Sequence, residues 1–249
     1  MKFSVLLPMF FLCGCASVQI PENFSYREIQ AGTFTLASWQ KIEKPGQPVK
    51  IYIEGDGRAF NAYGIPSADP TPREKFVRKL AFKDPHGNVV YLARPCQFIN
   101  KPPCGQKYWT TGRFAAEVID SAAAAVKAVA GNAPATLVGF SGGAQVAALV
   151  SALHPEINIK KIITISGNLD HPAWTELHKV LPLKDSLDLN NYKDIFSKKD
   201  TVNYAGEKDR IVPPFLIRNF AGENKTVIVP GASHSSYPEK AAEEIRLDI

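Results

Sequence analysis

The sequence predicts an α/β fold in which a mostly parallel central sheet carries helices on both faces and is preceded by an N-terminal antiparallel hairpin. Short apolar runs of strand length alternate with longer helical runs from about residue 49 to the end of the chain. That alternation is typical of strand-helix-strand units, which build parallel sheets. Residues 24–30 and 33–42 instead alternate apolar and polar side chains around Ala31-Gly32, which favours a hairpin.

Size and composition fit one globular domain. The chain has 249 residues, of which 45% are hydrophobic and 21% charged, and no internal repeat, low-complexity tract or charge block divides it. The formal net charge is +5, and the basic residues are scattered along the chain rather than gathered in stripes. Nothing in this pattern supports binding to nucleic acid.

Residues 1–14 have the features of an export signal. Lys2 precedes an apolar run at 3–12 that is too short to span a bilayer, and the run ends in Leu12-Cys13-Gly14-Cys15. This ending resembles the lipobox of bacterial lipoproteins, in which a leucine and a small residue stand three places and one place before the modified cysteine. An ordinary cleaved secretion signal is the alternative.

The lipobox resemblance implies a protein that is anchored to a membrane. Cys15 would be the acylated residue, 15–23 a lipidated tether and 24–249 the folded domain. The three acyl chains of such lipoproteins exceed the two signals that stable anchoring needs. Ala16, rather than an aspartate, follows the cysteine, and by the sorting pattern of these lipoproteins this implies the outer membrane.

The segment at 136–149 carries the clearest chemical signal. An apolar run of strand length reaches Gly139, Ser141 follows two places later, and an alanine-rich helical run begins at Gly142-Gly143. Glycines at 139 and 143 leave room for a strand and a helix to pass closely around a sharp turn. Ser141 would project from the tip of that turn, and the Gly142 amide would point to where an oxyanion forms. This is the pattern of a nucleophile elbow.

Two later segments supply partners for Ser141. Asp209 lies in a Gly-x-x-Asp-x-x-Val-Pro segment at 206–213, and His234 lies in a later loop, each directly after a strand-like apolar run. The order Ser141, Asp209, His234 within residues 49–249 resembles the serine hydrolases of the α/β-hydrolase superfamily. The resemblance implies the α/β-hydrolase fold and a triad in which His234 takes the serine proton and Asp209 orients the imidazole.

Asp170 is a second candidate for the triad acid. It follows a strand-like run at 161–166, and some hydrolases of this fold draw their acid from that place. It lacks the motif that surrounds Asp209 and directly precedes a helical run at 172–180, so we expect it to cap that helix. The segment at 167–199 is interpreted as a small cap insertion over the site, whose histidines and tryptophan serve in packing and in the cleft wall rather than as metal ligands.

Glu54-Gly55-Asp56-Gly57 follows a strand-like run at 49–53. In α/β-hydrolases this junction carries the second oxyanion donor, often in a His-Gly motif, and here Glu54 replaces the histidine. Asp56 directly follows the first glycine, so its amide is the expected donor, with the amide of Gly57 as the alternative. A glycine turn without a catalytic role is the third interpretation.

Cys96 and Cys104 enclose Pro102-Pro103 in a short loop. Because an exported protein meets an oxidising compartment, we expect these cysteines to form a disulfide bond. Two free thiols are the alternative. A metal site is disfavoured, because no other cysteine or clustered histidine completes a ligand set.

Together these motifs predict a membrane-anchored serine hydrolase that cleaves a carboxylic ester or thioester through an acyl-enzyme, without a cofactor or metal. Its substrate would be an acyl-containing small molecule or lipid. The alternatives are a peptidase or amidase with the same triad and a non-catalytic binding lipoprotein that keeps the fold. The fold by itself does not choose among them.

Overall fold

The computed structural model describes residues 19–248, so the predicted leader and the acylation site at Cys15 lie outside the described residues. Within 19–248, eight strands form one sheet in the order β1-β2-β4-β3-β5-β6-β7-β8. The strands are β1 (Ser25–Ala31), β2 (Phe34–Ile42), β3 (Val49–Ile53), β4 (Asn88–Leu92), β5 (Ala135–Phe140), β6 (Ile159–Ile165), β7 (Thr201–Gly206) and β8 (Thr226–Val229).

The predicted hairpin and parallel sheet are both present. β1 pairs antiparallel with β2, and β2 pairs antiparallel with β4. The six strands β4, β3 and β5 to β8 are parallel to one another. Parallel strands place all their carboxyl ends at one edge, so the loops that leave β3, β5, β7 and β8 meet there. This edge brings together segments that lie far apart in the sequence.

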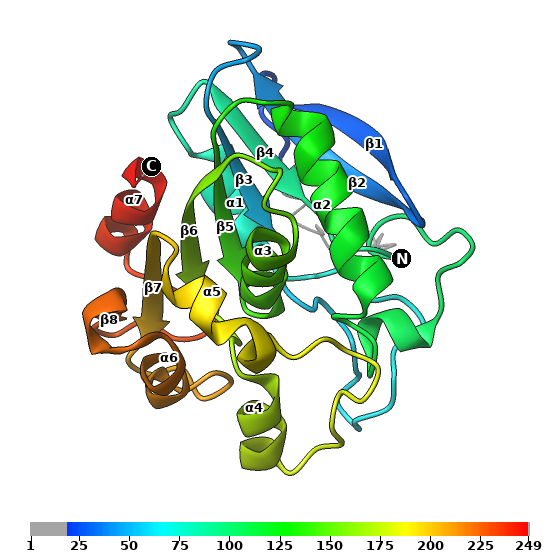
Figure 1. Ribbon diagram of the computed structural model, residues 1–249, viewed down its shortest axis with the longest axis vertical. Coiled ribbons are helices and arrows are strands. Elements are labelled where there is room, and N and C mark those ends of the chain that lie inside the picture. Colours follow the sequence, from blue (N-terminus) through cyan, green and yellow to red (C-terminus); the bar gives the residue numbers. More distant parts are fainter. Residues whose placement is uncertain (1–18, 249) are drawn as a thin grey trace, which may run out of the picture.

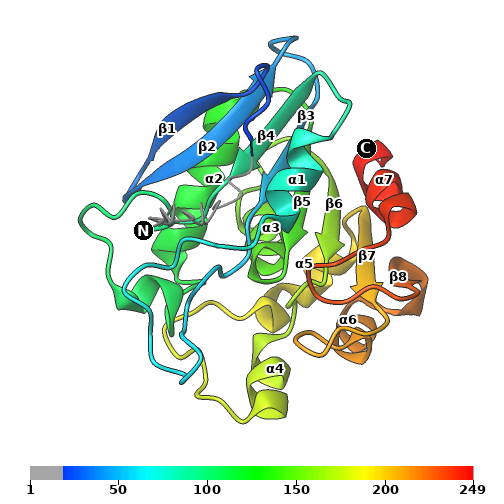
Figure 2. The same cartoon turned by 180° about the vertical axis from the view of Figure 1, so that it is seen from behind.

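Helices cover both faces of the sheet (Figures 1 and 2). Alanine-rich α2 and α3 pack on one face, and α1 and α7 on the other, where they bury separate apolar clusters against the strands. The helices are α1 (Phe76–Phe82), α2 (Ala116–Ala130), α3 (Gly142–Leu153), α4 (His171–His178), α5 (Lys193–Ser197), α6 (Pro214–Ala221) and α7 (Glu239–Leu247). Short 3-10 turns occur at Gln106–Trp109, Leu189–Tyr192 and Glu223–Lys225.

Two helices begin later than the sequence pattern predicts. The run at 73–82 becomes helical only at Phe76, because residues 71–75 form an irregular segment whose Pro72 and Glu74 line the pocket over Ser141. The run at 113–130 becomes helical only at Ala116, since the Arg113 side chain is turned inward and its Nε donates to the Thr110 carbonyl at 2.8 Å. Both differences arise where the chain borders the candidate site.

Within residues 19–248, no helix combines the length and apolarity that crossing a membrane requires.

Candidate active site

Ser141 lies at the tip of a tight turn between β5 and α3. Its backbone has φ 50° and ψ −120°, a conformation that costs energy for a residue with a side chain. Any side chain at Gly139 would collide with α3, since a Cβ there would lie 2.5 Å from the Cα of Ala144. The fully buried β5 and the packed helix hold the turn in place, so the backbone of Ser141 has a fixed position.

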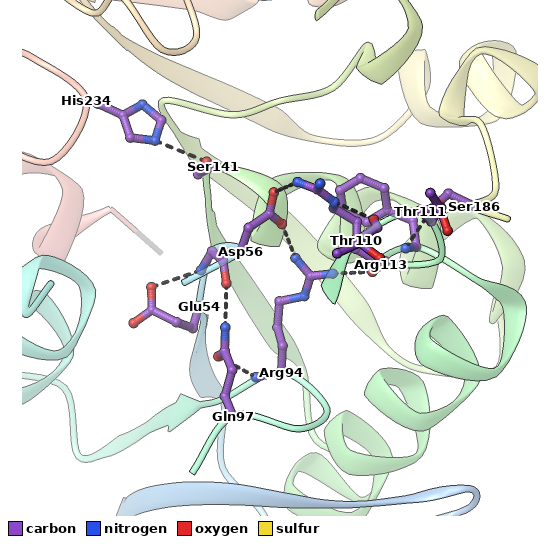
Figure 3. Close-up of polar contacts among 12 residues, drawn as sticks. Glu54, Asp56, Arg94, Gln97, Thr110, Thr111, Arg113, Ser141, Ser186 and His234 are labelled. Atoms are coloured by element: carbon purple, nitrogen blue, oxygen red, sulfur yellow. Dashed lines mark hydrogen bonds and ion pairs between the residues drawn. The ribbon is translucent and has the colours of Figure 1, made fainter. Parts of the chain in front are cut away.

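His234 faces this hydroxyl from the loop that follows β8. Its Nε2 lies 3.1 Å from Ser141 Oγ, within hydrogen-bond distance, as Figure 3 shows. The imidazole also packs on Phe140, with ring centroids 5.1 Å apart. The strand end and the C-terminal loop therefore place an imidazole nitrogen where it can take the serine proton.

Asp209 holds the opposite side of the imidazole. Its Oδ2 lies 2.9 Å from His234 Nδ1, and its Oδ1 accepts hydrogen bonds from the amides of Ile211 at 2.8 Å and Val212 at 2.9 Å. Burial opposes the ionised form, but the hydrogen bonds from His234 and the Val212 amide outweigh burial and lower the pKa of Asp209. A carboxylate in this position favours the tautomer that carries its proton on Nδ1 and leaves Nε2 as a base.

Asp170 has a different place in the fold. It is the N-cap of α4, where its Oδ1 accepts from the Ala173 amide at 3.1 Å and from Asn190 Nδ2 at 3.1 Å. Among the described residues no hydrogen bond or ion pair joins Asp170 to His234, whereas Asp209 makes both with the histidine. Two residues of α4 brace the Asp209 loop from outside, because Trp174 Nε1 and His178 Nε2 each lie within 2.8 Å of the Ile211 carbonyl.

The amides available for an oxyanion come from two elements. Gly142 is the first residue of α3, and its amide has no intrahelical partner. Across from it, the β3–α1 loop passes close to the elbow, since a Cβ at Gly55 would lie 3.2 Å from Ser141 Cβ. Among the described residues, the amides of Asp56 and Gly57 have no hydrogen-bond partner, so either could donate to an oxyanion.

Glu54 occupies the position at which the family motif often has a histidine. Its Oε2 accepts from the Tyr91 hydroxyl at 2.7 Å and its Oε1 from the Gly55 amide at 2.9 Å. Burial raises the pKa of Glu54, although both hydrogen bonds and two nearby arginines oppose the rise. Glu54 thus shapes the loop beside the serine through buried hydrogen bonds.

A pocket of about 300 Å³ opens over Ser141 and His234. Its wall combines apolar groups from α4 and the Asp209 loop with polar groups from the β3–α1 loop. Besides the serine and histidine, the lining residues are Glu54, Asp56, Gly57, Pro72, Glu74, Phe140, Asn168, Trp174, Ile211, Val212 and Ser235. A pocket of this size accommodates a small acyl group.

The predicted disulfide bond between Cys96 and Cys104 is present, with Cα atoms 5.5 Å apart. The bridged loop carries Gln97, whose Nε2 donates to the Gly55 carbonyl at 2.9 Å. The disulfide loop therefore supports the β3–α1 loop beside Ser141. Within residues 19–248, no three histidine, cysteine or acidic side chains are grouped so that they could hold a metal ion.

Sequence reasoning missed two buried arginines beside the site. Arg94 and Arg113 both bind the carboxylate of Asp56 (Figure 3). Arg94 could have been suspected, because it stands just past the carboxyl end of a buried strand, where polar residues often serve a site. Arg113 gave no such signal, since it lies within the run that predicts a helix.

Solved structures share this architecture over most of their length. A serine hydrolase from the polyaromatic-hydrocarbon-degrading bacterium Cycloclasticus zankles matches with a TM-score of 0.60 and 14% identity, over 90% of this chain and 97% of its own. Est1E from Butyrivibrio proteoclasticus matches with a TM-score of 0.58 and 17% identity, over 89% and 96% of the two chains. An α/β serine hydrolase without a lid from Xanthomonas campestris matches with a TM-score of 0.54 and 16% identity, over 91% of each chain.

No protein-family model matches the sequence, and no curated protein matches it. At identities of 14 to 17%, the likeness to solved structures concerns the fold. The strand order, the helices on both faces and the antiparallel N-terminal hairpin agree with it. The chain has the α/β-hydrolase fold.

Proposed function

We propose that this protein is a serine hydrolase that cleaves a carboxylic ester or thioester through an acyl-enzyme. The hydrogen-bonded chain from Asp209 through His234 to Ser141, at the tip of a strained strand-to-helix turn, carries this proposal. The fold it shares with structures described as serine hydrolases also supports it.

The contacts suggest the following steps. Ser141 Oγ attacks the acyl carbonyl carbon while its proton moves to His234 Nε2, and Asp209 stabilises the imidazolium that forms. The Gly142 amide and one amide of the Asp56-Gly57 pair donate to the oxyanion of the tetrahedral intermediate. As the carbonyl re-forms, the alcohol or thiol leaves with the proton from His234.

Water completes the cycle. It attacks the acyl-enzyme and gives a proton to His234, and the collapse of the second intermediate returns that proton to Ser141 Oγ and releases the carboxylic acid. Each step uses side chains and backbone amides of this chain.

A substrate panel tests the proposal. Purified protein is assayed with matched acyl esters, thioesters and amides of increasing acyl length, with the Ser141→Ala variant as control. We expect turnover of short-chain esters or thioesters that Ser141→Ala abolishes. Preferential turnover of the amides would indicate a peptidase or amidase, and no turnover of any substrate would favour a binding protein with this fold.

We further propose that the protein is tethered to a membrane through acylated Cys15, with the outer membrane as its location. The support is the sequence of the leader, from Lys2 to the Leu-Cys-Gly-Cys motif. Intact-mass measurement of protein from a bacterial host should find three acyl chains at Cys15 and none in a Cys15→Ser variant. A mature N-terminus at Ala16 without lipid would instead indicate an ordinary secretion signal.

A further inference from the structure

The carboxylate of Asp56 is held between two guanidinium groups beside the candidate nucleophile. Arg94 Nη1 donates to its Oδ1, and Arg113 Nη1 donates to its Oδ2 at 2.5 Å (Figure 3). The side chains of Arg94 and Arg113 are only 5% and 6% exposed, so water competes little for these contacts. Asp56, Arg94 and Arg113 are called the clamp below.

The two arginines are themselves fixed. Arg94 Nη2 donates to the Arg113 carbonyl, and the Arg94 guanidinium lies 5.0 Å from the ring centroid of Phe114. Arg113 Nε donates to the Thr110 carbonyl at 2.8 Å. The turn that precedes α2 therefore holds the clamp rigidly against the rest of the fold.

The clamp touches the elbow directly. A Cβ at Gly142 would lie 2.8 Å from the Asp56 Cγ and 2.9 Å from Arg94 Nη1, so the carboxylate and one guanidinium are packed onto the first residue of α3. Gly142 also offers one of the candidate oxyanion amides. The clamp thus contacts both segments that offer candidate oxyanion amides, the start of α3 at Gly142 and the β3–α1 loop at Asp56.

The loop that carries Asp56 has few other restraints at this point. The Gly55 amide and carbonyl are used by Glu54 and Gln97, but the amides of Asp56 and Gly57 have no partner among the described residues. An oxyanion donor must stay free until an oxyanion forms, so its own hydrogen bonding cannot orient it beforehand. The Asp56 side chain supplies an anchor on the same residue.

Charge gives the clamp a second effect. Burial opposes the ionised form of Asp56, but the charges of Arg113 and Arg94 outweigh burial and lower its pKa. One carboxylate and two guanidinium groups together carry a net charge of +1. The two arginines therefore keep Asp56 in the ionised form that both of them bind, and they offset the repulsion that a lone carboxylate would exert on a developing oxyanion.

We propose that Asp56, Arg94 and Arg113 are positioning groups that aim the Asp56 amide at the oxyanion. The inference rests on the proposed serine hydrolase function. It assigns to two arginines a role in turnover, in addition to any role in stability.

The test compares two buried carboxylates. Asp56→Asn keeps the shape of the side chain but removes the charge that the two guanidinium groups share. Asp84→Asn is the matched control, because Asp84 is buried, lies 3.5 Å from Lys50 Nζ and accepts from Tyr52 at the amino ends of the parallel strands, away from the site. Each variant removes a carboxylate that two basic side chains contact, Arg94 and Arg113 at Asp56 and Lys50 and His86 at Asp84. Only Asp56 lies beside Ser141.

The measurements are the thermal midpoint and the separate kcat and KM values on the best ester of the substrate panel. We expect kcat to fall about 10- to 100-fold in Asp56→Asn, with KM changed less than about threefold, because an oxyanion donor acts in the transition state. Asp84→Asn should lose thermal stability and keep kcat within about twofold of wild type. Arg113→Lys, which keeps the charge but loses the forked geometry, should lower kcat by a smaller factor than Asp56→Asn.

A folded Asp56→Asn variant with kcat near wild type, or an equal loss of kcat in Asp84→Asn, would overturn the inference while leaving the proposed function standing. If Asp56→Asn does not fold, Arg113→Lys decides: a loss in kcat without a matching rise in KM supports the clamp, and an unchanged kcat overturns it. A wild-type protein that turns over no substrate and reacts with no serine-directed probe overturns the proposed function and the clamp together.

Discussion

Replacing Asp209 by asparagine tests the assignment of the triad acid. Asp209 Oδ1 accepts from two backbone amides, and the substituted side chain could keep both bonds through its carbonyl oxygen. Its amide group would then face His234 Nδ1, which lies 2.9 Å from Oδ2 in the native protein. Because an amide nitrogen donates where the carboxylate accepted, Nδ1 must become the acceptor and the proton must move to Nε2.

The expected loss in kcat follows from this tautomer change. A histidine protonated on Nε2 cannot take the proton of Ser141, and the analogous change in a serine protease triad lowers kcat by ~10⁴. That factor corresponds to about 5.4 kcal/mol in the activation free energy. We expect Asp209→Asn to lose turnover by about this factor in an ester hydrolysis assay, while far-UV circular dichroism remains that of the wild type.

Asp170→Asn is the matched control, since it makes the same substitution at the other candidate acid. Asn and Asp are about equally good helix N-caps, and the Ala173 amide bond can persist, so this variant should keep its stability within a few tenths of a kcal/mol, and its turnover unchanged. A large loss in Asp170→Asn together with near-normal turnover in folded Asp209→Asn would refute the acid assignment. The serine and histidine assignments could survive that result.

Three further predictions concern stability, each measured by urea unfolding. Gly143→Ala should lower the free energy of unfolding by about 1 to 3 kcal/mol, because its Cβ would meet the backbone carbonyls of β3 and Glu54. The Cβ of Gly105→Ala would meet no other atom, so this control should be near neutral. Equal effects of the two substitutions would contradict the close crossing of strand and helix at Gly143. Burial raises the pKa of Glu54 in the folded protein, so its contribution to stability is full at pH values below its unfolded pKa and is lost as the pH rises through the folded pKa. Glu54→Gln should therefore gain stability relative to wild type as the pH rises above about 4.5. A difference that stays constant with pH would count against the raised pKa. Cys104→Ser should lower the free energy of unfolding by about 2.6 kcal/mol, the value for closing a nine-residue loop, and reductant should have the same effect on the wild type. A urea midpoint of the wild type that reductant does not change would argue against a stabilising disulfide bond.

The parts of the site that could be predicted from sequence are those encoded locally. Glycines around Ser141 and the Val-Pro pair after Asp209 each specify a turn within a few residues, and strand ends then fix where those turns lie. The hairpin was equally local, because alternation and Ala31-Gly32 lie in one short segment. The sheet and its hairpin are accordingly confirmed.

The clamp could not be predicted in the same way. Its contacts join residues 38 and 57 positions apart, and no periodicity in the sequence links such positions. The same cause explains why α2 begins later than predicted. Arg113 fits a helical pattern, but in the structure its side chain binds Asp56 beside the site. Tertiary contacts of buried charges overrode the local preference at that point.

Covalent labelling of Ser141 tests the central claim most directly. Purified protein is treated with a fluorophosphonate, which reacts with activated serines, digested, and analysed by peptide mass spectrometry. We predict a single adduct on the peptide that contains Ser141, lost in Ser141→Ala and strongly reduced in His234→Ala, because His234 Nε2 must take the serine proton at 3.1 Å. An adduct on another serine, or labelling that persists in Ser141→Ala, would contradict the assignment of Ser141 as the nucleophile.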